Sequence, residues 1–264
     1  MGVEFLILTV YFICIVYVLY QMALSVEAKL EDQVEIVLLK DHLEAAVNEQ
    51  LRQQTLYRAE AKVQPHKDGN LLKITFFDDA DQVAGAIGLQ VSPTGKRPLQ
   101  PPLNHLGVSV ANTLPDQQVF INWDYSALSV YGGPAQRVIR QIPGRPTDLF
   151  QPQVVTVVNP GLQTTVAVTG ENLLTRPESQ ISLEFGSTLI DLSRMPEMKE
   201  PMRQYSLRIL LWVRSMANPN SPAMQLLVPF DFCINVLPDH VALPILSWLL
   251  NFDPFVLNPL GRRQ

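Results

Sequence analysis

The first two dozen residues constrain this chain more than any other part, because they contain a long apolar stretch. From Phe5 to Leu24 no residue is charged, and twelve residues are Leu, Ile, Val or Phe. A helix of this length rises roughly 30 Å, the thickness of the hydrocarbon core of a bilayer, and each of these side chains favours insertion by about 0.3–0.6 kcal/mol. The alternative, a buried core helix, fits poorly with the length and the lack of a polar face. The sequence therefore predicts a transmembrane helix over residues 4–25.

A cleaved signal peptide is the other alternative for this stretch. Signal peptides start with a basic region and end in a small-x-small cleavage site. Only residues 1–4 precede the apolar run, without Lys or Arg, and no convincing Ala-x-Ala sequence follows it. We therefore expect a retained single-pass anchor and a membrane location. The side of the membrane stays open, because Lys29 and Lys40 favour a cytoplasmic domain, whereas a large domain after an N-terminal anchor is commonly translocated.

The next segment, residues 27–62, predicts a short helical stalk. It is polar and free of Gly and Pro up to Ala61, and apolar residues recur every four positions at Leu39, Leu43, Val47 and Leu51. This stripe either packs on the following domain or pairs with a second copy, which leaves a homo-oligomer open. The cluster Ile36–Leu39 breaks the pattern and is also compatible with a short strand.

From residue 70 onward apolar residues recur with a period of two, which indicates strands with one face in a core and one in water. The clearest runs are Leu72–Phe76, Val119–Trp123, Leu207–Val213 and Val228–Val236. The 21 prolines also argue against a mainly helical chain. The fold class is therefore mainly β with α, with an antiparallel β-sandwich over residues 103–238. Residues 63–102 predict a small α+β segment that ends in a linker, Gly85–Pro102.

The C-terminal segment, residues 239–264, is apolar but is interrupted by Pro244, Asp253 and Pro254, so it is too short to span a membrane. One interpretation is a short apolar helix that closes an open end of the sandwich. The other is contact with the bilayer, with aromatic rings at the lipid interface and two arginines near the headgroups. The residues predicted to make this contact are Trp248, Phe252, Phe255, Arg262 and Arg263.

Side chains suited to catalysis or metal binding are few and scattered. The four histidines lie in separate segments without the short spacing of neighbouring metal ligands. The acidic run from Asp78 to Asp81 lacks the Gly and Glu that an EF-hand loop requires. Cys14 and Cys233 are expected to stay apart, one in lipid and one in the domain. We predict no catalytic residue, no cofactor and no metal site, and therefore a protein that is not an enzyme.

The stretch Gln117–Arg140 predicts a strand, a tight Gly-Gly turn and a second strand. Trp123 lies in strand alternation, so we expect it in the core rather than on a ligand platform. Asp124, Tyr125 and Arg137 lie near the turn. We predict that these three side chains form a structural polar cluster around a charge-assisted pair.

Several stretches carry a resemblance to a known kind of protein. They are WDYSAL at Trp123–Leu128, the Arg137-Val138-Ile139 strand after a glycine turn, and the closing strands with Leu-Arg-Ile-Leu-Leu and Val-Pro-Phe-Asp-Phe. Over roughly residues 105–237 the chain resembles uncharacterised cyanobacterial single-pass membrane proteins with an immunoglobulin-like or late-embryogenesis-abundant-like β-sandwich. The resemblance implies a fold and a membrane tether, and it supplies no functional residues.

These observations favour some partners and exclude others. The net charge is −5 and no run of Lys and Arg exceeds two residues, so a nucleic-acid partner is not expected. We expect a non-enzymatic, membrane-anchored interaction or assembly module that acts on a membrane-protein complex, with the lipid bilayer and another membrane protein as partners. The alternative is a protein that binds lipid or another apolar ligand at the membrane surface.

Overall fold

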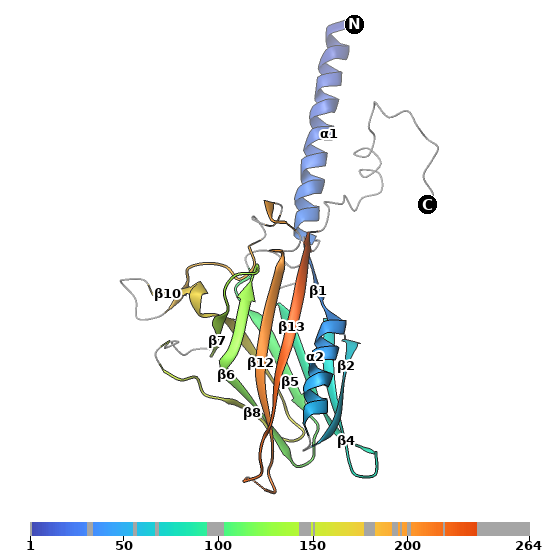
Figure 1. Cartoon of the computed structure of the whole chain (residues 1–264). Coiled ribbons are helices and arrows are strands. Elements are labelled where there is room, and N and C mark those ends of the chain that lie inside the picture. The colour runs from blue at the N-terminus through green and yellow to red at the C-terminus, as the bar shows by residue number, and fades with distance from the viewer. Residues whose placement is uncertain are drawn as a thin grey trace. The chain divides into compact units, whose positions relative to one another are not determined.

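The computed structural model describes residues 2–30, 34–54, 57–66, 69–93, 103–142, 149, 151–176, 183–191, 195, 197–199, 202–218 and 220–236. The chain divides into two compact units. The N-terminal helix belongs to one unit, and the other contains Val34–Lys96 and Gln100–Val236. Both are drawn in Figure 1. The predicted C-terminal segment, with Trp248, Phe252, Phe255, Arg262 and Arg263, lies outside the described residues.

The N-terminal unit contains α1, an α-helix from Gly2 to Leu30. Its stretch Glu4–Met22 has 19 residues, none of them buried, and α1 is the one helix of the described chain that is long and apolar enough to cross a membrane. The hydroxyl of Thr9 donates to the carbonyl of Phe5 at 2.8 Å, so this polar group is satisfied without water. A membrane anchor and a signal sequence both fit this helix.

The second unit is built on an antiparallel sheet of eleven strands. These are β1 (Val34–Leu38), β2 (Arg58–His66), β3 (Gly69–Phe77), β4 (Val83–Pro93), β5 (Leu106–Asn112), β6 (Gln117–Val130), β7 (Gln136–Gln141), β8 (Thr156–Val158), β9 (Gln163–Gly170), β12 (Gln204–Ser215) and β13 (Met224–Val236). Their order is β1-β13-β12-β6-β7-β9-β5-β4-β3-β2, and β8 pairs with β6 beside this path. A 3-10 turn (Glu171–Leu173) follows β9, and the short strands β10 (Leu174–Thr175) and β11 (Glu184–Phe185) pair with each other.

The predicted mainly β, antiparallel domain is confirmed, but its strands form one continuous curled sheet, a half-barrel, instead of the two separate sheets of a sandwich (Figure 1). Strand β7 is the reason. Its residues Gln136 and Arg137 pair with β6, whereas Val138–Gln141 pair with β9. A strand that changes partner part-way along its length carries a sheet around a corner.

Helix α2 (Lys40–Gln53) packs against strands near the two ends of this sheet, β13 and β2 (Figure 1). Leu43, Val47 and Leu51, spaced every four residues, are buried. The predicted stripe therefore packs on the domain, the first of its two interpretations. Leu39 lies just before the helix and stays partly exposed.

Side chains on both flanks of α2 pair with the backbone of these strands. The amide of Gln50 donates to the carbonyl of Leu227 at 2.8 Å and accepts from its N–H at 2.8 Å. On the opposite flank, Asn48 donates to the carbonyl of Ala61 at 2.9 Å and accepts from its N–H at 2.9 Å. Two further contacts extend the flanks, Glu44 with the N–H of Val63 and Gln54 with the carbonyl of Gln225, both at 3.1 Å. Helix α2 therefore takes the place of a strand between β13 and β2.

Large side chains from all parts of the sheet fill the inside of the curl. The fully buried ones include Trp123, Tyr205, Phe230, Leu72, Ile87 and Leu106. The rings of Tyr205 and Phe232 stack with centroids 4.6 Å apart. Burial of each such side chain contributes roughly 1.5–3 kcal/mol, so the core that stabilises the fold spans both halves of the sheet.

The predicted stalk, residues 27–62, is not one helix. It contains the end of α1, strand β1, helix α2 and the first half of β2. The Ile36–Leu39 cluster, which broke the helical pattern, is mostly strand, because Val34–Leu38 pair with Phe232–Val236. Long-range pairing thus overrides a helix-favouring composition here.

The predicted linker Gly85–Pro102 is wrong for its described part, because β4 extends through Pro93 and pairs with both β3 and β5. Gly85 is needed for packing. A Cβ at this position would lie 2.8 Å from the carbonyl oxygen of Thr113 and 2.9 Å from the Cα of Leu114. Residues 63–93 therefore share a sheet with the strands of the predicted sandwich, and glycine here marks close backbone approach.

Candidate functional site

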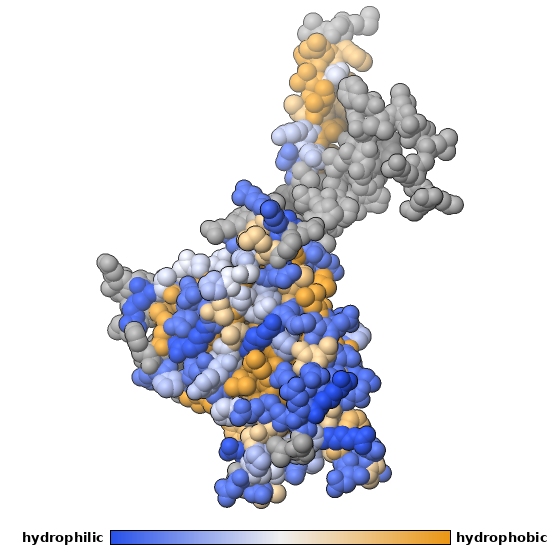
Figure 2. All heavy atoms as spheres, viewed as in Figure 1, coloured by the Kyte–Doolittle hydropathy of each residue, from blue (hydrophilic) through white to orange (hydrophobic). Residues whose placement is uncertain are grey.

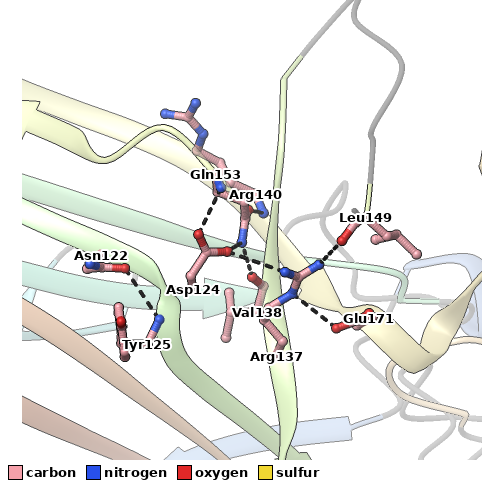
Figure 3. A network of polar contacts seen from close by, with 9 residues as sticks. All are labelled: Asn122, Asp124, Tyr125, Arg137, Val138, Arg140, Leu149, Gln153 and Glu171. Carbon is pink, nitrogen blue, oxygen red and sulfur yellow. Dashed lines mark hydrogen bonds and ion pairs between the residues drawn. The ribbon is translucent and has the colours of Figure 1, made fainter. Parts of the chain in front are cut away.

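Two of the three residues predicted to form a polar cluster meet at the β7 corner (Figure 3). The guanidinium of Arg137 lies 3.6 Å from Asp124 Oδ1, and its Nε donates to Glu171 Oε2 at 3.0 Å. Its Nη2 donates to the carbonyl of Leu149 at 2.6 Å. Arg137 thereby connects β7 with β6, with the turn after β9 and with the segment that leads to β8.

Gln153 completes this network, although the sequence analysis did not single it out. Its backbone N–H donates to Asp124 Oδ2 at 2.8 Å, and its side-chain amide donates to Asp124 Oδ1 at 3.0 Å and to the carbonyl of Val138 at 2.7 Å. Its Oε1 accepts from the N–H of Arg140 at 2.7 Å. No local spacing could have revealed this residue, because Asp124 and Gln153 are 29 positions apart.

Tyr125 does not join the network, because its side chain is 72% exposed. Its backbone N–H donates to Asn122 Oδ1 at 3.3 Å, and this is the contact that a dashed line marks for it in Figure 3. Strand β6 bulges at this point: Asn122 pairs with Leu210 and Ala127 pairs with Arg208, so β6 has four residues where β12 has one. The bulge breaks the alternation on which the sequence prediction depended.

A groove of about 710 Å³ lies beside this network. It is lined by the end of β7, the middle of β9, the residue before β5 and the β10–β11 pair, namely Arg140, Gln141, Ile142, Thr165, Val166, Ala167, His105, Leu174, Leu183 and Phe185. The volume falls within the roughly 300–1,000 Å³ of small-molecule sites. The lining combines an apolar wall with a basic and polar side, and none of the described lining residues is a carboxylate.

Arg140 is the charged residue of this groove. Its Nη1 donates to the hydroxyl of Thr156 at 2.9 Å, and the same hydroxyl accepts from the indole N–H of Trp123 at 2.8 Å. Its Nε is buried and has no hydrogen-bond acceptor among the described residues. Burial lowers the pKa of Arg140, but a guanidinium stays protonated in proteins. The site therefore holds a partly desolvated positive charge whose side-chain partner, in the described part of the chain, is a neutral hydroxyl.

His105 adds a polar aromatic ring to the groove. It stacks on Phe185 with ring centroids 6.5 Å apart and an interplanar angle of 26°. Burial lowers the pKa of His105 below its ordinary value of 6.5, so the imidazole is neutral near pH 7. Phe185 in turn is partly exposed, which places an aromatic face at the edge of the groove.

A second polar cluster, which the sequence analysis did not predict, lies where α2 begins. Asp231 of β13 lies 2.8 Å from His42 Nδ1 and 2.9 Å from Arg208 Nη1, and it accepts from the hydroxyl of Ser206 at 2.5 Å. Ser, His and Asp are the residue types of a hydrolase triad. Here, however, Ser206 and His42 both face the carboxylate, whereas activation of a serine requires a hydrogen bond to the histidine. The contacts seen attach the first turn of α2 to the sheet.

Large apolar side chains gather on the outer face of β8, β6, β12 and β13. This outer patch consists of Val157, Phe120, Trp212, Leu210 and Leu227, which share one face because they pair across these strands or alternate along them. Leu227 is 43% and Val157 is 44% exposed. The guanidinium of Arg214 lies 5.9 Å from the centroid of the Phe120 ring. Figure 2 shows apolar side chains at the surface on this side of the domain.

Within the described part of the chain, no group of three His, Cys, Asp or Glu side chains is placed to hold a metal ion. Cys14 and Cys233 are both free. Comparison with protein-family models, with curated proteins and with solved structures finds no match to this chain. The resemblance to cyanobacterial membrane-tethered sandwich proteins therefore stays a prediction.

Proposed function

We propose that this chain is a membrane-anchored, non-enzymatic interaction module whose outer patch binds another membrane protein. The observation that carries the proposal is the exposure of Leu227 and Val157 beside Phe120, Leu210 and Trp212 on a sheet face. Contiguous apolar patches on soluble domains mark interaction surfaces. The module acts by holding its partner at the bilayer to which α1 attaches it.

The membrane part of the proposal is that α1 stays in the mature protein as a single-pass anchor. Its exposed apolar surface has no counterpart in a water-soluble helix. Washing membranes at alkaline pH tests this. We expect the full-length chain, with residues 2–25 present, to stay in the membrane pellet. Recovery of a soluble chain that lacks these residues would instead identify α1 as a signal sequence.

The chemistry of the outer patch defines the partner. Trp and Arg are enriched at the centres of protein interfaces, and here Trp212 pairs directly with Phe120, beside Arg214. A complementary surface would present apolar side chains to this centre and a carboxylate to Arg214. The partner is therefore a protein with an acidic-rimmed apolar surface, held in the same membrane.

Photo-crosslinking of the full-length chain in its own membrane tests this surface. A photoreactive residue at Leu227 or Val157 should give one discrete protein adduct of the same mass from both positions. Gln64, an exposed polar position on β2, is the control because it belongs to neither the outer patch nor the groove. We expect the adduct to disappear when Leu210→Glu is added to the Leu227 probe.

The outcomes separate the alternatives. Adducts of equal yield from Gln64, or none from the patch, would overturn the proposed surface. An adduct of twice the chain mass would show that the partner is a second copy of this chain and would overturn the proposal of a different protein. A purified partner should bind the Gln64→Glu chain as well as the unchanged chain, and bind Leu227→Glu at least tenfold more weakly.

A further inference from the structure

We infer that the groove beside β7 binds an amphiphilic anion, a molecule with a phosphate or carboxylate group on an apolar chain. Arg140 and His105 form its polar side, and Ile142, Leu174, Leu183 and Phe185 form its apolar wall. The residues that line the groove lie on β7, on β9, before β5 and on or beside the β10–β11 pair, and none of them belongs to the outer patch. The inference therefore goes beyond the proposed function.

The anionic part follows from the unbalanced charge of Arg140. Its guanidinium is partly desolvated. Among the residues that the structure describes, its one side-chain partner is the neutral hydroxyl of Thr156, and its Nε is a buried donor without an acceptor. A buried charge is costly unless it is paired. The nearby Arg137 shows the contrast, because Asp124 and Glu171 both lie within ion-pair distance of it. An oxyanion at Arg140 would supply the missing acceptor and counter-charge through charge-assisted hydrogen bonds.

The apolar part follows from the opposite wall. Leu174 and Phe185 belong to the β10–β11 pair, and they face the groove together with Ile142 and Leu183. Ile142 is 40% and Phe185 is 39% exposed, so their burial by a ligand would be favourable at about 25 cal/mol per Å². An inorganic anion would contact only the polar side, whereas an amphiphile contacts both.

Calorimetric titration of the full-length chain in neutral nanodiscs tests the inference with three probes. Octyl phosphate carries both parts of the ligand, inorganic phosphate carries only the anion, and octanol carries only the chain. We expect octyl phosphate to bind at least tenfold more tightly than either of the other two. If inorganic phosphate binds as tightly as octyl phosphate, the groove is a site for anions alone. If octanol binds as tightly, the groove is a site for apolar chains alone. Either result would overturn the inference that the ligand is an amphiphilic anion.

Substitutions locate the binding. Arg140→Gln should weaken octyl phosphate binding at least tenfold, and Arg140→Lys should weaken it less because the charge is kept. Phe185→Ala should weaken octyl phosphate but leave inorganic phosphate unchanged. Arg52→Gln is the matched control, because Arg52 is an exposed arginine on α2. This variant should bind octyl phosphate as tightly as the unchanged chain.

Thermal unfolding without ligand separates binding from folding. If Arg140→Gln unfolds at a lower temperature than the unchanged chain, two other variants still test the site. Phe185→Ala changes a side chain at the surface, and Arg140→Lys keeps the positive charge. Unchanged affinity in Phe185→Ala together with unchanged affinity in a folded Arg140 variant would place the ligand elsewhere. That result would overturn the inference and leave the proposed interaction function untouched.

Discussion

The curled sheet turns by different means on its two sides. At the β7 corner the backbone ladder continues from β6 through β7 to β9, and Arg137 with Gln153 holds the corner from outside the ladder. At the α2 seam, where the helix lies between β13 and β2, the amides of Gln50 and Asn48 pair with strand backbone. The corner has a continuous backbone ladder that the side chains of Arg137 and Gln153 reinforce, whereas the seam between α2 and the strands depends on side-chain contacts.

This difference decides where the domain is vulnerable. An unpaired strand edge is a template for pairing with another chain. Without α2, β2 would be open, and so would the part of β13 that β1 does not pair. The apolar stripe of the helix, Leu43, Val47 and Leu51, fixes the helix on the domain. The side-chain amides of Asn48 and Gln50 then bind the backbone of β2 and β13. We therefore expect the seam to open before the corner does, and to open towards self-association.

The largest expected effect comes from removing the apolar contact of the seam. Leu43→Ala deletes most of a fully buried side chain and should lower the free energy of unfolding by about 2–5 kcal/mol. Chemical denaturation of the full-length chain in detergent measures it. Glu49→Ala, an exposed position on the same helix, is the control and should stay within about 0.5 kcal/mol. Equal losses in the two variants would show that α2 does not hold the seam.

The next largest effect belongs to the corner. Arg137→Met keeps the length of the side chain but leaves Asp124 and Glu171 without their shared cation. Because these groups are partly exposed, the loss should be about 2 kcal/mol instead of the full cost of a buried unpaired charge. Arg137→Lys should recover part of it. If the corner depends on the backbone ladder alone, both variants will unfold at the same denaturant concentration as the unchanged chain.

The elements with strong local patterns were predictable. The α1 stretch, the strands β6, β12 and β13, and the stripe of α2 each follow from hydropathy and period. Strand β1 was one of two alternatives for its segment, whose composition favours a helix, and β4 was missed because it contains glycines that serve packing. The single curled sheet was not predicted either, because the change of partner within β7 depends on residues far apart in the sequence and leaves no local pattern.

The candidate sites were only partly predictable. Asp124 and Arg137 lie either side of one turn, so their meeting followed from hairpin geometry. The groove draws on residues from His105 to Phe185, and the cluster at Asp231 joins His42 to strands far along the chain. Such sites depend on tertiary pairing, and periodicity in one sequence contains no information about them.

A smaller effect is expected from the pairing amides of the seam. Asn48→Ala and Gln50→Ala should each cost about 1 kcal/mol, because each removes two hydrogen bonds to backbone groups that water can partly reach. The double variant should also self-associate more than Leu227→Glu, which alters side chains and leaves the edge paired. Analytical ultracentrifugation in detergent measures this. A double variant that is destabilised yet stays in the oligomeric state of the unchanged chain would contradict the role of α2 as a cover for strand edges.

The smallest expected effect is on the pH dependence of stability, and it comes from His105. His105, in the groove on the corner side, has a pKa that burial lowers below 6.5, so below about pH 6.5 the unfolded chain takes up this proton first. The stability that the neutral imidazole allows at pH 7.5 is therefore lost as the pH falls through this range, and the loss is complete below the folded-state pKa.

His105→Asn should show a smaller drop in the free energy of unfolding between pH 7.5 and pH 5 than the unchanged chain. His66→Asn, at an exposed position at the end of β2, is the control: it removes a histidine outside the groove and should show the same drop as the unchanged chain. An identical drop in all three chains would mean that the His105 ring is as accessible to protons in the folded domain as in the unfolded one, and the groove would then be open to water at its polar side.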